Sequence, residues 1–312
     1  MKNSIANYYE WETKKRSLRA WRDAVVTVGF IGTGLMGLPM AERLLAANLS
    51  VIAYNRTSEK LEPLKNAGVA IAQSPVEVLQ EAECVLLMLT DAPAIQAVLL
   101  SPEARSALAG RTIIQMGTIA PSESRAIASE VEAAGGDYLE APVLGSIPEA
   151  QAGKLIVMVG SSPEQFQRWL SLLQQLGPET RLIGEVGSAA ALKLALNQLI
   201  GSLTTAFALS LGFVMRQGVD VETFMDILRN SALYAPTFDK KLQRMVERNY
   251  ANPNFPTKHL LKDMTLFLGE AQSAGLNANS LEGVQAILEM AQKLNLAEAD
   301  YSALFSAVSP ED

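Results

Sequence analysis

The sequence predicts an α/β fold in two parts: a doubly wound parallel sheet first, and an all-α domain after it. Three observations lead to this prediction. Short apolar runs alternate with helical patterns from Val25 to about Ile183, a glycine-rich turn joins the first run to the first helix, and only helical patterns follow Gly187. Repeated strand–helix–strand units build a parallel sheet, because each helix carries the chain back across the sheet before the next strand begins.

The apolar runs of the first part have the length expected of buried strands. Several of the helical patterns between them open with proline or serine, which suits the N-terminus of a helix. After the first strand we expect strands at residues 51–54, 84–89, 112–116, 138–141 and 155–159, and helices at residues 58–66, 93–100, 121–134 and 163–175.

The second part opens with one long helix, expected over residues 188–217, that is rich in alanine and leucine and carries few charges, among them Lys193 and Arg216. A helix this apolar is buried on most of its surface. One small domain does not supply that much burial, so we expect a homodimer or homotetramer in which a partner subunit covers part of the helix. Further helices are expected at residues 221–230, 236–248, 258–274 and 280–294.

The length of 312 residues suggests two domains, which we place at residues 24–186 and 187–312. Residues 1–23 are rich in Lys, Arg, Glu and aromatic residues, and they lack the apolar core of a signal peptide. We expect them to form a disordered or loosely docked extension. An upstream start codon is one explanation of this segment, and a targeting role is the less favoured alternative.

The charge balance and the rare residues exclude several classes of protein. A net charge of −7 leaves no basic stripe for a nucleic acid. With one cysteine and one histidine, neither a disulfide within the chain nor a zinc site is expected, and the chain suits the reducing cytoplasm. No apolar run of about 18 or more residues is free of charges, so no membrane span is expected.

The glycine-rich turn reads Gly32-Thr33-Gly34-Leu35-Met36-Gly37, with an apolar run before it and a helical pattern after it. In a dinucleotide-binding turn of this spacing, the first glycine permits the tight turn, the second lets the backbone approach a pyrophosphate, and the third lets the helix lie close to the strand. The helix N-terminus then directs its free N–H groups at the phosphates. Because both flanking elements are present, the sequence predicts a dinucleotide site here.

The end of the second strand indicates which dinucleotide binds. NAD sites usually have an acidic residue there, about 20 residues after the turn, to bind the ribose 2′-hydroxyl. This strand ends in Asn55-Arg56-Thr57 instead. A carboxylate would repel a 2′-phosphate, whereas Arg56 can hold one through its planar guanidinium and Thr57 can add a hydroxyl donor. The residues favour NADP, with an ordinary polar loop as the alternative.

Lys193 is the first candidate for chemistry. A charged side chain in an apolar helix is costly to bury, so it should face a cleft, with Asn197 one turn later on the same face. Desolvation lowers the pKa of a lysine, which suits a proton donor to a carbonyl near neutral pH. A lysine that extends to the protein surface is the alternative.

Three further segments are candidates. Lys262 and Asp263 follow an apolar pair near the start of a helix, where they face either a cleft or solvent, and His259 is expected to be a structural or capping residue. The loops at residues 140–146 and 117–121 each follow a strand, which is where ligands bind in open parallel sheets. The glycine of the first loop exposes N–H groups for a carboxylate, and a plain surface loop is the alternative reading of both.

Together these pieces resemble the β-hydroxyacid dehydrogenase family, which includes 3-hydroxyisobutyrate dehydrogenase, tartronate semialdehyde reductase and the glyoxylate/succinic semialdehyde reductases. The resemblance covers nearly all of residues 25–306. It implies a Rossmann-type domain followed by an all-α domain, as in 6-phosphogluconate dehydrogenase. The four motifs that carry it, in the family's order, are Gly-Phe-Ile-Gly-x-Gly-x-Met-Gly at 29–37, Glu-Ala-Pro-Val at 140–143, Lys193 with Asn197, and Lys258-His259-x-x-Lys262-Asp263.

The resemblance also implies roles for individual residues. Lys193 is the general acid in reduction, Asn197 orients the substrate, and Phe255 and Asp263 shape the closed site. The strand end at residues 55–57 resembles the NADP-using reductases. The expected cofactor-binding residues are Gly32, Thr33, Gly34, Leu35, Met36, Gly37, Asn55, Arg56, Thr57, Leu89, Thr90, Thr118 and Lys262.

One position departs from the family. After Ala-Pro-Val the family loop usually continues with Ser-Gly, and the serine hydroxyl helps to hold the substrate carboxylate. This chain has Leu144 there, which makes the pocket more apolar. Gly145 and Ser146 remain, so their backbone amides and the Ser146 hydroxyl are the donors left for an acid. The expected substrate loop is Val143, Leu144, Gly145 and Ser146.

The expected function is NADPH-dependent reduction of small aldehyde acids, such as glyoxylate or succinic semialdehyde, with the proton supplied by Lys193. The alternatives are a 3-hydroxyisobutyrate-type dehydrogenase, an imine reductase and a non-catalytic NADP-binding protein. Imine reductases generally lack the helix lysine. A defunct site would have lost some of the polar residues named above. The imine reductase and the non-catalytic protein are therefore less favoured.

Overall fold

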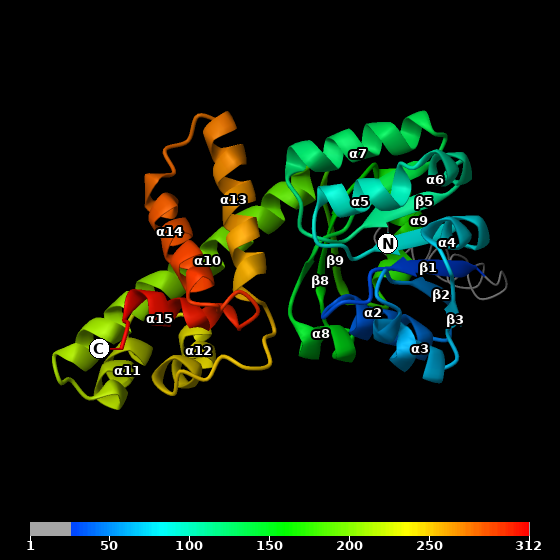
Figure 1. The fold of residues 1–312 in the computed structure, drawn as a ribbon. Coiled ribbons are helices and arrows are strands. Elements are labelled where there is room, and N and C mark those ends of the chain that lie inside the picture. The colour runs from blue at the N-terminus through cyan, green and yellow to red at the C-terminus, as the bar shows by residue number, and fades with distance from the viewer. Residues whose placement is uncertain (1–25, 312) are drawn as a thin grey trace, which may run out of the picture. The chain divides into compact units, whose positions relative to one another are not determined.

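The computed structural model describes residues 26–311, which form two compact units (Figure 1). The first unit consists of the described residues up to Gly117 together with Glu123–Ala189, and the second consists of Thr118–Ser122 together with the chain from Ala190 onward. The extension expected at residues 1–23 lies outside the described part of the chain. The predicted α/β class, a Rossmann-type sheet followed by an all-α part, is confirmed.

The first unit is built on one sheet of nine strands. These are β1 (Thr27–Ile31), β2 (Ser50–Tyr54), β3 (Ala70–Ile71), β4 (Cys84–Leu87), β5 (Thr112–Gln115), β6 (Asp137–Glu140), β7 (Val143–Leu144), β8 (Ile156–Gly160) and β9 (Glu179–Gly184). Their order is β3-β2-β1-β4-β5-β6-β8-β7, and β9 pairs with β8. In the centre of the sheet, Gly29 of β1 is in register with Ile52 of β2 and with Val85 of β4.

The sheet is parallel from β3 to β6, as the alternating pattern predicts, but it is not parallel throughout. Strand β8 runs antiparallel to β6 and β7. Parallel neighbours need a crossover of a dozen or more residues, and the chain between β7 and β8 contains only the short helix α8 (Ile147–Ala152). The chain therefore returns beside β7 in the opposite direction. Strand β9 is parallel to β8 again, because helix α9 (Pro163–Leu173) separates them.

Helices cover both faces of this sheet (Figure 1). One hydrophobic cluster joins the strands to α2 (Gly37–Ala46), α3 (Glu62–Asn66), α8 and α9, with Trp169 fully buried in it. Helices α4 (Pro75–Glu81), α5 (Ala92–Leu99) and α6 (Pro102–Ala107) contact one another, and α5 lies with α7 (Pro121–Ala133) on the other side in Figure 1. Helices α5 and α9, which the sequence predicts, and α4 and α6, which it does not, all begin with a Ser or Asp side chain that accepts a first-turn N–H and with an early proline.

The second unit is helical. Its elements are α10 (Ser188–Arg216), α11 (Val221–Arg229), α12 (Pro236–Val246), α13 (Thr257–Ser273), α14 (Asn279–Lys293), the short 3-10 helix η2 (Tyr301–Ala303) and α15 (Leu304–Val308). One cluster of buried side chains connects all of them, and Phe207 of α10 stacks on Phe238 of α12 with ring centroids 4.7 Å apart. Helix α10 is thus the core helix of this unit.

Helix α10 is buried on one face and exposed on another. Thr204, Phe207 and Leu211 are buried, whereas Leu209 and Phe213 are 63% and 64% exposed. Within the described chain, this 29-residue helix is also the one element long and apolar enough to cross a membrane, and 33% of its apolar window is buried. A core helix meets the same criterion, so length and hydropathy alone do not make α10 a membrane span.

Candidate functional site

The turn between β1 and α2 leaves one position open. Gly32 has a φ of 99°, and a Cβ there would overlap the carbonyl oxygen of Met88. A Cβ at Gly37 would overlap the carbonyl oxygen of Gly32. A Cβ at Gly34, in contrast, would meet no atom within 4 Å. The fold itself therefore requires glycine at positions 32 and 37, whereas Gly34 leaves room that a pyrophosphate can fill.

The start of helix α2 suits an anion. Its N-cap residue, Met36, makes no side-chain capping hydrogen bond, and its first turn contains no acidic residue. Helix N-termini present free N–H groups and a partial positive charge, which favour a phosphate. Leu35 is 46% exposed beside this turn, whereas Met36 packs against the hydrophobic cluster of the sheet.

The end of β2 lies beside the glycine turn. The Thr33 N–H donates to Oδ1 of Asn55 at 3.0 Å, and Nδ2 of Asn55 donates to the carbonyl oxygen of Thr57 at 2.9 Å. Asn55 thereby ties the two loops together, while Arg56 and Thr57 are exposed. An Asn at this position adds no negative charge beside Arg56.

The loops after β4 and β5 lie against each other. A Cβ at Gly117 would overlap the carbonyl oxygen of Leu89. The side chain of Gln115 fixes this loop, because it accepts from the Gly117 N–H and donates to the Gly117 carbonyl oxygen at 2.9 Å. Leu89 is half-buried and Thr90 is exposed. Because these loops leave the same edge of the parallel strands as the glycine turn, the structure collects these predicted cofactor residues of the first unit at one edge.

In the second unit, Lys193 lies on α10 one turn before Asn197. Nδ2 of Asn197 donates to Oδ2 of Asp263, on α13, at 2.6 Å, and both residues are at least 98% buried. A carboxylate can only accept a hydrogen bond here, so the Asn197 amide must direct its Nδ2 at Asp263 and its Oδ1 away from it. Among the described residues, no hydrogen-bond donor reaches Oδ1 of Asn197. A buried acceptor without a donor is costly, which makes this oxygen a candidate for binding a ligand hydroxyl or ammonium group.

Lys262 completes this cluster. Its Nζ lies 3.0 Å from Oδ1 of Asp263 and donates to the carbonyl oxygen of Thr118 at 2.5 Å. The structure therefore brings together four residues from three predicted segments, and Lys262 and Thr118 alone are 144 positions apart. They are Asn197, Asp263, Lys262 and Thr118, with Lys193 on the same helix as Asn197.

The electrostatics of Lys193 suit proton transfer. Burial lowers the pKa of Lys193 to about 8; the positive charge of Lys262 lowers it further, and the Asp263 carboxylate opposes both. A lysine with this pKa is mostly protonated at neutral pH and still gives up its proton readily. Burial and the neighbouring lysines also lower the pKa of His259, which keeps that imidazole neutral near pH 7.

Phe255 lies just before α13 and packs edge-on against Tyr301, with ring centroids 5.8 Å apart. The Tyr301 N–H also donates to the Phe255 carbonyl oxygen at 3.0 Å. The Phe255 ring is therefore held by the C-terminal segment of the chain, at the start of the helix that carries Lys262 and Asp263.

Glu140 has a role that the sequence did not suggest. It is fully buried at the end of β6, where its Oε1 accepts from the N–H groups of Gly187 and Ala189, both at 2.8 Å. Ser124 donates to its other oxygen and shares a hydrogen bond with Tyr138. A negative charge at a helix N-terminus is stabilising. Glu140 thus anchors the start of α10, the helix that carries Lys193.

Two hydrogen-bond donors of the predicted substrate loop are paired with Glu149, a residue that the sequence analysis did not single out. The N–H and the hydroxyl of Ser146 both donate to Oε2 of Glu149, at 2.8 and 2.7 Å. Ser146 is the N-cap of α8 and Glu149 its third residue, so the Ser-x-x-Glu spacing of a capping box could have revealed the pair. Leu144 is half-buried, and Gly145 is exposed with a φ of 135°.

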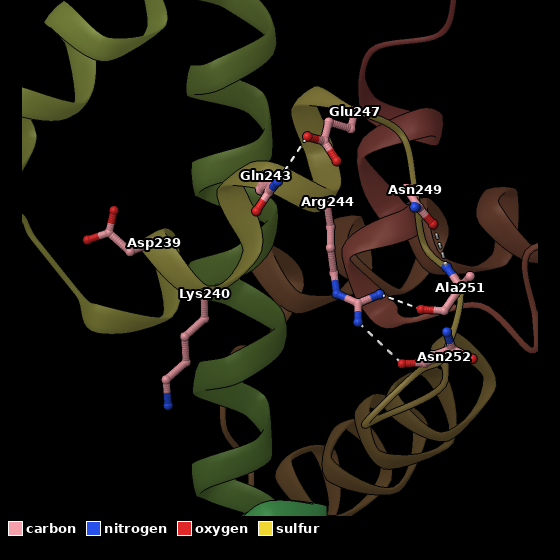
Figure 2. Close-up of a pocket in the computed structure, with 8 residues that line it drawn as sticks. All are labelled: Asp239, Lys240, Gln243, Arg244, Glu247, Asn249, Ala251 and Asn252. Atoms are coloured by element: carbon pink, nitrogen blue, oxygen red, sulfur yellow. Dashed lines mark hydrogen bonds between the residues drawn. The ribbon is translucent and has the colours of Figure 1, made fainter.

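A separate cavity of about 340 Å³ lies on α12 and the loop that follows it (Figure 2). Arg244 spans it and donates to the carbonyl oxygens of Ala251 and Asn252, while Gln243 donates to Glu247 at 2.9 Å. None of the predicted site residues lines this cavity. Its polar groups hold the loop in place, and we assign it no catalytic role.

The residues of the first unit fit a nicotinamide dinucleotide, because Gly34 leaves open space at an uncapped helix start and no carboxylate stands at the end of β2. A Rossmann-type sheet with such a turn, followed by a helical unit with a lysine of lowered pKa, defines the class of nicotinamide-dependent dehydrogenases and reductases.

Comparison with known proteins agrees with this class. Residues 27–184 match the family described as the NAD binding domain of 6-phosphogluconate dehydrogenase, and residues 187–308 match the NAD-binding domain of NADP-dependent 3-hydroxyisobutyrate dehydrogenase. Glyoxylate/succinic semialdehyde reductase 1 of Arabidopsis thaliana is 31% identical over 283 residues, which are 90% of this chain and 98% of the relative. The 2-hydroxy-3-oxopropionate reductase of Escherichia coli is 31% identical over 286 residues, 90% and 96% of the two chains.

A solved structure described as Psf3 in complex with NADP+ and 2-OPP is 26% identical and superposes with a TM-score of 0.79 over 90% of this chain and 100% of the other. The chain therefore belongs to the β-hydroxyacid dehydrogenase family. It is an NAD(P)-dependent oxidoreductase that acts on CH–OH groups.

Proposed function

We propose that the protein reduces small aldehyde acids with NADPH, and that glyoxylate and succinic semialdehyde are the first substrates to test, because the name of a relative includes them. The observation that carries the proposal is the cluster on α10 and α13. Lys193, whose pKa burial lowers to about 8, lies one turn from the buried Asn197. Such a pair is suited to a carbonyl group that must gain a proton.

In the proposed reaction the bound dinucleotide supplies a hydride to the carbonyl carbon. Lys193 gives its proton to the carbonyl oxygen, so that the C=O group becomes a CH–OH group and the lysine is left neutral. Asn197 orients the substrate, since Asp263 holds its amide in one orientation. Donors that are already in place stabilise the developing alkoxide without reorganisation in the reaction. Solvent then returns a proton to Lys193.

We propose that the dinucleotide is NADP and that it contacts two sets of residues. The first set lies at the carboxyl edge of the sheet, where Arg56 and Thr57 are exposed and no acidic residue competes for a 2′-phosphate. The second set is Thr118 and Lys262, which the family resemblance assigns to the cofactor. Phe255 and Asp263 would shape the substrate site, and residues 143–146 would form its loop.

We also propose a homodimer or homotetramer in the cytoplasm, with a nucleotide domain at 24–186 and a helical domain at 187–312. The exposed apolar face of α10 supports the assembly. The residues Leu199, Leu203, Ala206, Leu209 and Phe213 are exposed at intervals of three or four positions, which places them on one side of the helix. An apolar stripe of this kind is typical of a subunit contact.

An NADPH-oxidation screen tests the proposed function. The substrates are glyoxylate, succinic semialdehyde, tartronate semialdehyde, methylmalonate semialdehyde and a cyclic imine. At least one aldehyde should be reduced, and Lys193→Ala should lower kcat by roughly 10²–10⁴-fold, the usual range for a positioned acid. Lys193→Arg should fail too, because a guanidinium does not release a proton near neutral pH.

The matched control is Lys293→Ala, which removes an exposed lysine at the end of α14 and should leave kcat unchanged. NADPH affinity should also be unchanged in Lys193→Ala, because other residues hold the nucleotide. If Lys193→Ala retains more than half of the original kcat, the lysine is not the acid. Reduction of the imine alone would reject carbonyl chemistry.

A further inference from the structure

The start of helix α13, which carries two residues of the candidate cluster, is held by segment 297–301, which follows α14. The N-cap residue of α13 is Pro256, which makes no side-chain capping hydrogen bond. Instead, the Thr257 N–H donates to the Ala299 carbonyl oxygen at 2.8 Å, and the next N–H donates to that of Ala297 at 3.0 Å. The first N–H groups of a helix have no partner within the helix, so the groups that accept from them fix where it begins. Segment 297–301 therefore determines the position of the first turn of α13.

The same segment also holds the residues just before α13. Asp300 forms an antiparallel bridge with Pro256, and the Tyr301 N–H donates to the Phe255 carbonyl oxygen at 3.0 Å. The Tyr301 ring lies edge-on to the Phe255 ring, with centroids 5.8 Å apart. The entry into α13 thus depends on where Asp300 and Tyr301 lie.

A buried ion pair fixes these two residues. Nζ of Lys241, on α12, donates to both carboxylate oxygens of Asp300, at 2.8 and 2.9 Å, and lies 4.1 Å from the centre of the Tyr301 ring. Asp300 is fully buried and Lys241 is 8% exposed. The N–H and the hydroxyl of Ser302 also donate to Oδ1 of Asp300, at 3.1 and 2.7 Å. The carboxylate is therefore held on both sides, by α12 and by its own turn.

Stability alone does not require such a pair. Taking two charges out of water costs about as much as their attraction returns, and apolar side chains of similar volume often replace a buried ion pair without loss of stability. Burial lowers the pKa of Lys241, and the Asp300 carboxylate opposes that shift. The pair supplies a fixed geometry instead, because an ammonium that bonds both oxygens of a carboxylate and faces an aromatic ring is satisfied in one position only.

We propose that Lys241 and Asp300 are positioning residues for the reduction. Their ion pair fixes segment 297–301, and that segment fixes the first turn of α13. Helix α13 in turn holds the Asp263 carboxylate where it orients the Asn197 amide. The inference rests on the proposed reductase function and adds two residues that act on it through α13.

The experiment measures kcat, KM and the free energy of unfolding. Lys241→Met and Asp300→Asn should each lower kcat of the folded protein by about tenfold or more, with a smaller change in KM, because misorientation slows the chemical step. Asp300→Asn keeps an oxygen for Ser302 and is the milder variant if Lys241→Met does not fold. The double variant Lys241→Gln with Asp300→Asn should recover most of the lost kcat, since the two amides can hydrogen-bond to each other.

Two controls separate position from stability. Lys240→Met removes the neighbouring lysine of α12, which is exposed, and should leave both kcat and stability unchanged. Met225→Ala truncates a fully buried side chain on α11, so it should lower the free energy of unfolding and leave kcat of the folded protein unchanged. If Lys241→Met lowers kcat no more than Met225→Ala does, the ion pair only stabilises the fold and the proposal is wrong.

Hydrogen exchange tests the same contacts without turnover. In Lys241→Met, the amide hydrogens of Thr257 and Tyr301 should exchange at least about tenfold faster relative to that of Phe207 in α10. Met225→Ala should leave that ratio unchanged. An unchanged ratio in Lys241→Met would overturn the role of the ion pair. Faster exchange at these amides in a protein that reduces no aldehyde would support the hold of the ion pair on α13 and reject the reductase.

Discussion

Lys193 illustrates how one residue can serve function at the expense of stability. Its pKa lies at about 8 in the folded protein, well below the ordinary lysine value of 10.5, because burial disfavours the charged form. Below pH 8 the folded protein must keep an ammonium group in a poorly solvated place. The free energy of unfolding is therefore lower than it would be with an apolar side chain at this position.

This cost can be measured. Between pH 8 and 10.5 the unfolded chain binds more protons at Lys193 than the folded protein does, so the contribution of this group to stability rises with pH across that window and is least favourable below pH 8. Lys193→Met should raise the free energy of unfolding at pH 7 by about 1–3 kcal/mol, measured by urea titration, while abolishing activity. Lys293→Met should stay within about 0.5 kcal/mol of the wild type.

If Lys193 is the acid, as we propose, the same residue should set the pH dependence of reduction. Activity should fall as pH rises through about 8, since the neutral lysine has no proton to donate. The measurement is kcat/KM for the best aldehyde from pH 6 to 9.5. A profile that stays flat to pH 9 would contradict the assignment of Lys193 as the acid.

Arg56 is the residue on which the proposed choice of NADP depends. It is exposed at the end of β2, beside Asn55, with no carboxylate at that strand end. NADPH should be preferred over NADH by at least about tenfold in kcat/KM, and Arg56→Asp should erase or invert the preference. Arg181→Asp, on β9 near the opposite end of the sheet, is the control and should not change the ratio. Equal use of both nucleotides by the wild type would reject the NADP assignment.

Among the elements, α10 combines the largest number of constraints. Its start is anchored by Glu140, its buried face forms the core of the helical unit, and its first turns carry Lys193 and Asn197. Its remaining face is apolar and exposed, and Leu209 and Phe213 are its most exposed large apolar side chains. An apolar face on a core helix is expected to be covered by a partner subunit.

Charge on that face should therefore weaken assembly. Leu209→Lys with Phe213→Lys should raise the dissociation constant of the oligomer by roughly a hundredfold or more, since two apolar side chains expected in the subunit contact become charged. Multi-angle light scattering across a dilution series measures the change. Leu276→Lys alters an equally exposed leucine after α13 and should leave the mass unchanged. A wild-type protein that is monomeric at micromolar concentration would show that α10 is not the contact.

On the scale of the whole molecule, most of the fold could be predicted from apolar periodicity. Strands β1, β2, β4, β5, β6 and β8 and all the long helices have runs of sufficient length and regularity. Strands β3 and β7 have two residues each, too few to produce a pattern. Strand β9 was missed because Glu179 and Arg181 interrupt its apolar residues and most of it is exposed. The reversal of β8 depends on the length of a connection and not on any strand's own composition.

The parts of the candidate site that depend on a single residue or a short motif could be predicted from the sequence. The contacts between residues far apart in the chain could not. The glycine turn and the lysine in an apolar helix can both be recognised in the sequence. The turn has a characteristic glycine spacing between a strand and a helix, and a lysine is costly to bury in an apolar helix. The bond between Asn197 and Asp263 joins residues 66 positions apart, which no local pattern encodes. The bond between Glu149 and Ser146 is local, but a Ser-x-x-Glu spacing by itself does not show that the Ser146 donors are occupied.

The segment Thr118–Ser122 belongs to the helical unit although it lies between two strands of the sheet unit in the chain. Its Thr118 carbonyl oxygen accepts from Lys262, and the Ser122 hydroxyl donates to Glu270. A recombination that exchanged everything after residue 187 between two members of the family would therefore place Lys262 of one parent against Thr118 of the other. The two units are interleaved in the chain, so a functional chimera needs one crossover on each side of that short segment in addition to the one at the apparent domain boundary.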